Sequence, residues 1–170
     1  MTFSPAVVMA SALLLSASAL VWAAANDVRF YQIPNLAPAV VAVAFLLMAT
    51  VMRPVFVLTG LGTGAGVFAV GALLFARRLM GGGDVKLLAA AALWCGPGLL
   101  APFALVTSLT GAALAVVMLS PLGRRLPAPP TDGWAPSGAG FAALRQPTPF
   151  GVAIAAGGLW VLSRYVVLIR

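Results

Sequence analysis

Residues 81–87 read Gly81-Gly82-Gly83-Asp84-Val85-Lys86-Leu87, so three glycines and an acid stand at the start of an apolar segment. The chain has only three acidic residues, all of them aspartates, and no histidine. An ionisable group at the edge of a bilayer is costly, which makes it a functional candidate by default. A second acid, Asp27, ends another apolar segment, and we expect folding to bring Asp27 and Asp84 together.

The composition predicts a membrane protein. The chain is 62% hydrophobic and 8% charged, and its mean hydropathy is +1.09. A soluble globule of this size needs more polar surface, so the lipid bilayer must be the solvent. We therefore expect an all-α fold, a polytopic integral membrane bundle of about six transmembrane helices, forming a single domain over residues 1–170.

The apolar segments give the expected spans. Four stretches are separated by polar breaks, and a fifth is interrupted by Gly96-Pro97-Gly98 and Pro102, so that it can form two short spans or one span plus a re-entrant piece. Residues 85–95 alone are too short to cross. The segments are 5–25, 36–52, 55–76, 85–119 and 150–169.

A cleaved signal peptide is the alternative for residues 5–25, because Ala23-Ala24-Ala25 imitates a cleavage site. No Lys or Arg precedes this run, and another apolar segment follows it. Both features favour a membrane span.

The net charge of +7 is compatible with nucleic-acid binding. The basic residues are, however, spread among short loops, so we expect no nucleic-acid partner and assign them to orientation in the membrane. With six crossings, the breaks that hold the acids carry seven basic residues and the opposite side carries three. This bias predicts that the acid-bearing loops face the cytoplasm.

Glycines spaced four apart predict close helix packing within residues 55–76. Gly60 pairs with Gly64 and Gly62 with Gly66, and small residues at this spacing let helix backbones approach in lipid.

Two carboxyl groups can hydrolyse a peptide bond without a metal. One acts as general base on water, while the other, protonated, polarises the carbonyl and then protonates the leaving amine. This reaction requires both acids at the same depth in the membrane. Asp27 and Asp84 meet this requirement, because each lies at an end of a predicted span. Gly81 and Gly83 are expected to admit an extended substrate and to allow positive φ, and Lys86 to anchor the segment or to bias the charge of the pair.

Each acid also has a structural alternative. Asp84 can be a helix N-cap after a glycine turn, and Asp27 can be a solvated loop acid. Asp132, in the Pro- and Gly-rich break 121–149, lacks a comparable context and is expected to be a loop residue.

No metal or cofactor is expected. Cys95 is the only cysteine and histidine is absent, which argues against zinc or haem chemistry and against an intrachain disulfide.

The sequence resembles the type IV prepilin peptidases, membrane aspartyl proteases with a Gly-x-Gly-Asp signature, and most of all the small members that serve Flp-type, tight-adherence pili. Three motifs carry the resemblance. Asp84 lies in Gly81-Gly82-Gly83-Asp84-Val85-Lys86-Leu87, Asp27 precedes Ile33-Pro34-Asn35, and the last segment opens Pro149-Phe150-Gly151-Val152-Ala153-Ile154.

The resemblance implies that Asp27 and Asp84 are the catalytic pair, with Pro34, Asn35, Pro149 and Gly151 in supporting motifs. It also implies a prepilin or pseudopilin substrate, whose short basic leader is cut at the cytoplasmic face of the bacterial inner membrane, and a link to pilus assembly machinery. The chain lacks the insertion with paired cysteines of the bifunctional relatives, so the resemblance does not extend to N-methylation.

Two other functions use the same features. A small proton-coupled transporter can use acids as a relay, although transporters place such acids near the midplane rather than at segment ends. A non-catalytic component of a pilus or secretion system needs neither acid.

Overall fold

The computed structural model of the chain describes residues 4–120 and 148–169, with side chains up to residue 166. Within these ranges it contains six α-helices and no strand. The predicted loop 121–149, with Asp132, lies almost entirely outside the described residues. The helices are α1 (Pro5–Phe30), α2 (Leu36–Ala49), α3 (Pro54–Ala76), α4 (Gly82–Leu93), α5 (Gly96–Leu119) and α6 (Phe150–Ile169).

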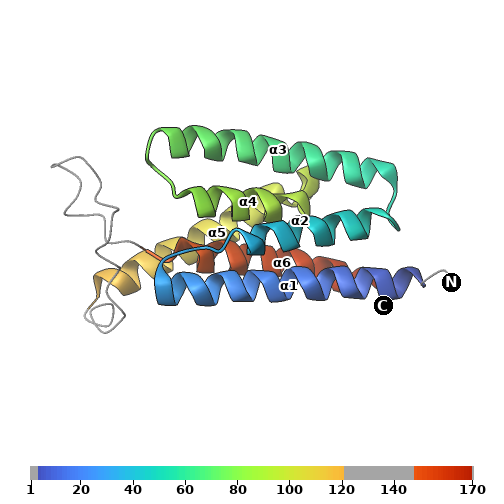
Figure 1. The fold of residues 1–170 in the computed structure, drawn as a ribbon, viewed down its shortest axis with the longest axis horizontal. Coiled ribbons are helices and arrows are strands. Elements are labelled where there is room, and N and C mark those ends of the chain that lie inside the picture. The colour runs from blue at the N-terminus through green and yellow to red at the C-terminus, as the bar shows by residue number, and fades with distance from the viewer. Residues whose placement is uncertain (1–3, 121–147, 170) are drawn as a thin grey trace.

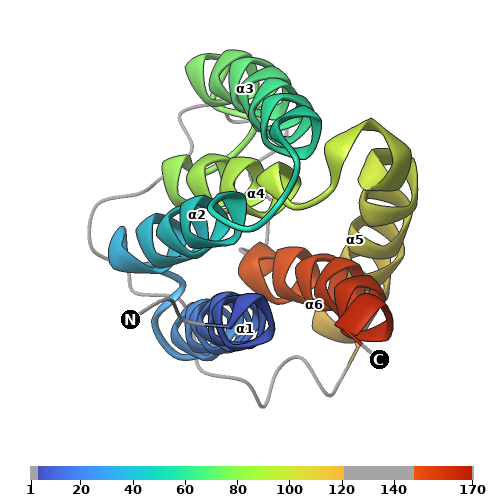
Figure 2. The same cartoon turned by 90° about the vertical axis from the view of Figure 1, so that its right-hand side faces the viewer.

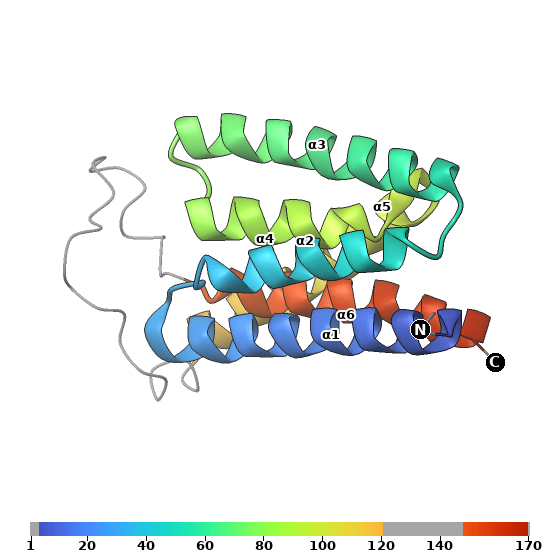
Figure 3. The same ribbon diagram turned by 45° about the vertical axis from the view of Figure 1, so that its right-hand side comes forward.

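The helices form a bundle in which each runs opposite to the one before it (Figures 1 and 3). Seen along the bundle, α6 lies between α1 and α5, and α4 packs against α2 and α3 (Figure 2). The alternation brings three segments to one end: residues 27–35, 77–84 and 148–151 (Figure 1). We call this the acid end, because it holds Asp27 and Asp84.

The surface confirms a membrane helical bundle. Large apolar side chains are exposed along the helices, for example Leu14, Leu58 and Val116, each 68% exposed. An apolar surface of this extent is rare on soluble monomers and suits lipid. Among the residues that the structure describes, three helices, α1, α3 and α5, are long and apolar enough to cross a membrane. At 12 residues, α4 spans only about 18 Å, too short for a crossing of about 30 Å.

α1 continues beyond the predicted end at residue 25. It runs to Phe30, and Tyr31 caps it in the left-handed conformation (φ 51°), with its N–H donating to the Asp27 carbonyl at 2.9 Å. No helix-breaking residue occurs before Pro34, so the polar residues continue the helix. Asp27 is therefore a buried helical residue, and its interpretation as a solvated loop acid is wrong.

The break between α4 and α5 lies at Trp94 and Cys95, and α5 starts at Gly96 in the left-handed region (φ 52°). Pro102 lies inside α5 and does not divide it. Irregular backbone is tolerated at membrane depth where it is buried and its polar groups are bonded. The Tyr165 hydroxyl donates to the Trp94 carbonyl at 2.6 Å, and both side chains are buried.

The glycines of α3 divide into two sets. A β-carbon at Gly60 would lie 2.5 Å from the Leu93 carbonyl oxygen, and one at Gly64 would lie 2.5 Å from the Leu93 side chain. Gly62 and Gly66 have no such atom within 4 Å. The predicted close packing is confirmed for Gly60 and Gly64 against α4. It is wrong for Gly62 and Gly66, which face away from the rest of the described chain.

We expect Gly60→Ala to lower the free energy of unfolding in detergent by roughly 1–3 kcal/mol, because the new methyl group forces α3 away from the Leu93 backbone. Gly62→Ala is the matched control and should be neutral or slightly stabilising, since alanine has the higher helix propensity. Equal unfolding midpoints for the two variants would contradict this α3–α4 contact.

Candidate active site

Asp27 lies in the last turns of α1 and is 5% exposed. Its Oδ2 accepts a hydrogen bond from the backbone N–H of Gly151 at 2.6 Å. Gly151 is the second residue of α6, and the first amides of a helix have no partner within the helix. The carboxyl of α1 therefore satisfies a free donor at the start of α6, where the helix dipole also favours negative charge.

Position 151 requires glycine. A β-carbon there would lie 2.9 Å from Asp27 Oδ2 and 3.0 Å from Ile33 Cδ1. Pro149 is fully buried just before α6, and its carbonyl accepts from the Val152 N–H at 3.2 Å. The third sequence motif thus forms a helix start that faces Asp27.

Asp84 lies in the first turn of α4, outside the three helices long enough to cross a membrane. The N-cap is Gly81, so the interpretation of Asp84 as the N-cap is wrong. The acid is the third helical residue and accepts a hydrogen bond from the Gly81 N–H, as the acid of a capping box does.

Burial is the main reason why the pKa of Asp84 rises to about 6, and the neighbouring Asp27 carboxyl acts in the same direction. The hydrogen bond from Gly81 opposes both effects. The influence of Asp27 shows that the two carboxyl groups lie within electrostatic reach of each other. The structure therefore brings the two predicted acids together at the acid end.

The glycines before Asp84 act by size rather than by positive φ. Gly81 is extended (φ −71°, ψ 145°), and Gly82 and Gly83 are already helical. The expected left-handed turn is therefore wrong: Gly96 is the positive-φ glycine in the described chain. A β-carbon at Gly83 would lie 3.1 Å from Ile33 Cβ, so this glycine lets the break before α2 approach α4.

Residues 31–35 connect the parts of the site. Ile33 abuts both Gly83 of α4 and Gly151 of α6. Asn35 Oδ1 accepts a hydrogen bond from Lys86 Nζ at 2.8 Å, and the Pro34 carbonyl accepts from the Ala37 N–H at 3.0 Å as α2 begins. The three motifs, far apart in the sequence, thus meet at one place.

Sequence reasoning missed two of these contacts. In the sequence Ile33 stands out only as part of the motif Ile33-Pro34-Asn35, and an apolar residue beside a proline gives no sign of two glycine partners. The Gly151 amide was not identified as a donor, although Pro149 before an apolar segment is a signal of a helix start with free N–H groups.

These features define a class: an integral membrane bundle that brings a buried and a half-buried carboxyl group to one end. The model of the type IV leader peptidase family matches residues 14–116, and the chain belongs to that family. The match includes Asp27, Ile33-Pro34-Asn35 and Asp84. Comparison with curated proteins and with solved structures gave no match. The chain is therefore a membrane peptidase of the prepilin-leader type, with prepilins as its substrate class.

We expect Gly151→Ala to lower the rate of leader cleavage by roughly 10–100-fold, because the new methyl group displaces Asp27, a candidate catalytic acid, and a shift of about 1 Å can cost up to about 100-fold in rate. The variant keeps the N–H donor, so the effect reports displacement of Asp27 and Ile33. Gly98→Ala, where the added methyl meets no atom within 4 Å, is the control. Cleavage by Gly151→Ala at the rate of the control would contradict this geometry.

Proposed function

We propose that this protein is an aspartic endopeptidase that removes the short basic leader of Flp-type prepilins or pseudopilins, with Asp27 and Asp84 as its catalytic pair. The observation that carries the proposal is the buried Asp27 carboxyl, hydrogen-bonded to the Gly151 N–H and within electrostatic reach of Asp84. No cofactor takes part in the proposed reaction.

The reaction needs one proton on the pair. Two carboxyl groups that lie close together in a site shielded from water do not both ionise, so the proposed pair holds one proton and titrates as a unit. The carboxylate takes a proton from a water molecule, whose oxygen bonds to the carbonyl carbon of the scissile amide. The protonated carboxyl meanwhile hydrogen-bonds to the carbonyl oxygen. The C–N bond then breaks, and the leaving amine takes a proton from the pair.

The acid end is proposed to face the cytoplasm in the bacterial inner membrane. It carries Arg29, Arg77, Arg78 and Lys86, whereas Arg53 lies in the link between α2 and α3 at the opposite end. An excess of basic residues marks cytoplasmic loops. A basic leader in the cytoplasm, followed by an apolar helix in the membrane, would then present its scissile bond at the depth of the two acids.

The restriction to Flp-type substrates and to the tight-adherence pilus system rests on the resemblance to the small Gly-x-Gly-Asp enzymes. The single cysteine, Cys95, is buried in the bundle, and a cysteine-bearing insertion is absent from the sequence. The whole chain is proposed to serve as one peptidase domain.

We expect Asp27→Asn and Asp84→Asn each to reduce prepilin cleavage by roughly 10²–10⁴-fold, the usual contribution of general acid–base catalysis. Asp132→Asn, the third acid of the chain, is the matched control and should retain the wild-type rate. The measurement is cleavage of a purified Flp-type prepilin in detergent or liposomes, with insertion of each variant checked separately.

Other outcomes identify the other functions. Proton-dependent flux that requires Asp84, with no cleavage, would indicate a transporter. Full function in cells with both Asn variants would indicate a non-catalytic component of the assembly machinery.

A further inference from the structure

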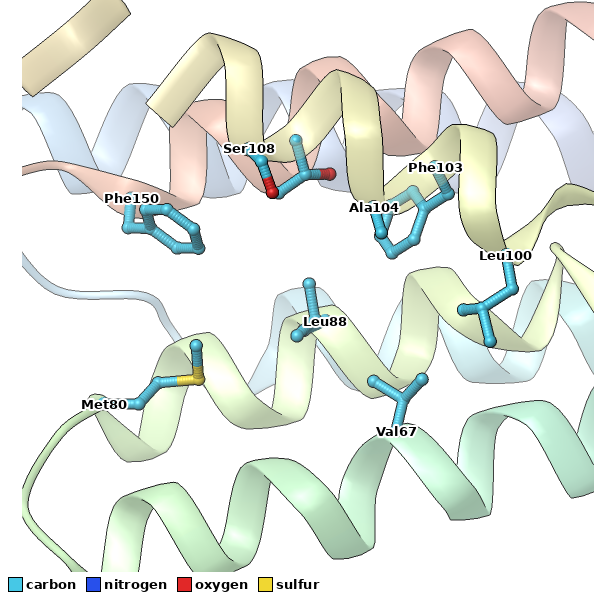
Figure 4. Close-up of a pocket in the computed structure, with 9 residues that line it drawn as sticks. Val67, Met80, Leu88, Leu100, Phe103, Ala104, Ser108 and Phe150 are labelled. Carbon is cyan, nitrogen blue, oxygen red and sulfur yellow. The ribbon is translucent and has the colours of Figure 1, made fainter. Parts of the chain in front are cut away.

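A cavity of about 230 Å³ lies between α4 and α5 (Figure 4). Its wall is almost entirely apolar and comes from α3, α4, α5 and the ends of the link before α4 and of α6. Residues contributing to it are Val67, Met80, Leu88, Leu100, Phe103, Ala104, Thr107, Ser108 and Phe150.

The cavity has two facing walls. Val67 and Leu88 lie on one side, and Ala104 and Ser108 lie on the α5 side (Figure 4). Ala104 and Ser108 are exposed, whereas Phe103 beside them is buried. The cavity is therefore a groove that opens sideways on the surface that faces lipid.

One end of this groove adjoins the two acids. Met80 directly precedes Gly81, whose N–H binds Asp84. Phe150 directly precedes Gly151, whose N–H binds Asp27. From Phe150 and Met80 the groove extends along the bundle to Leu100 (Figure 4). Between Leu100 and Ser108 it follows α5 for eight residues, about 12 Å or two helical turns.

We propose that this groove binds the apolar helix that follows the scissile bond of the substrate. This inference rests on the proposed function and adds a binding site to it. With the scissile bond between the acids, the leader lies on the cytoplasmic side and the apolar helix enters the membrane beside Met80 and Phe150. It then runs down the groove, antiparallel to α5.

The α5 wall suits a helix better than a lipid chain. Ala104 and Ser108 are small residues four apart on one exposed face, the spacing that lets two helix backbones approach in lipid. The volume exceeds the roughly 150 Å³ of an apolar cavity that accepts a benzene ring. The groove can therefore receive one or two large apolar side chains of a helix that lies along α5.

The first test is steric and uses a matched pair on α5. Ala113 is nine residues from Ala104, about 2.5 turns, and so lies on the opposite face of the helix; it is also exposed. We expect Ala104→Leu to lower kcat/KM for full-length prepilin at least tenfold, mainly through KM, and Ala113→Leu to change it less than twofold. Equal kcat/KM for the two variants would overturn the proposal.

The second test does not depend on turnover. A photo-crosslinking amino acid is placed at position 104 or 113 in the Asp84→Asn protein, and purified prepilin is added in liposomes. We expect an adduct from position 104 to the apolar helix of the prepilin and none from position 113. Adducts to lipid alone, or equal yields from both positions, would overturn the groove proposal. Failure of the wild-type protein to cleave prepilin would instead overturn the proposed function.

Discussion

The hydrogen bond from the Gly151 amide to the Asp27 carboxyl holds the acid end together. A carboxyl group that is 5% exposed in a membrane bundle is costly unless it is bonded. The start of α6 supplies a donor that would otherwise lack a partner, at 2.6 Å. One contact thus satisfies a buried acid of α1 and a free amide of α6, and fixes the distance between the first and last helices.

The break 31–35 extends this contact to α4. Ile33 fills the space left by two missing side chains, at Gly83 and at Gly151, and Asn35 binds Lys86 of α4. Gly83 and Gly151 are therefore packing residues that allow the starts of α4 and α6 to converge on one isoleucine. In this arrangement Asp84 acquires its raised pKa from burial and from its neighbour Asp27. The same convergence leaves Met80 and Phe150 at the mouth of the lipid-facing groove.

Much of this was predictable from the sequence because membrane helices depend on simple constraints. Hydropathy predicted five apolar segments and left open whether residues 85–119 divide in two, as α4 and α5 do, and α6 begins and ends where expected. Polarity was a poor guide to helix ends, since Asn26 and Asp27 continue α1. The glycine spacing predicted that α3 packs closely, but not which of its two glycine pairs makes the contact. Gly60 and Gly62 are equivalent in the sequence and differ only in the side of α3 on which they lie. The partner of Asp27 could not be predicted, as it is a backbone amide 124 residues away.

The central claim is that helix packing places the carboxyl groups of α1 and α4 side by side at one membrane face. Cysteines at positions 27 and 84, in a Cys95→Ala protein, test it when a short bifunctional thiol reagent is added to membranes. Trypsin cuts the denatured chain after Arg29, which separates position 27 from both position 84 and position 50. The account predicts fragments that stay joined for Asp27→Cys/Asp84→Cys and separate for Asp27→Cys/Thr50→Cys, whose second thiol lies at the opposite end. Separate fragments from the first pair would contradict it.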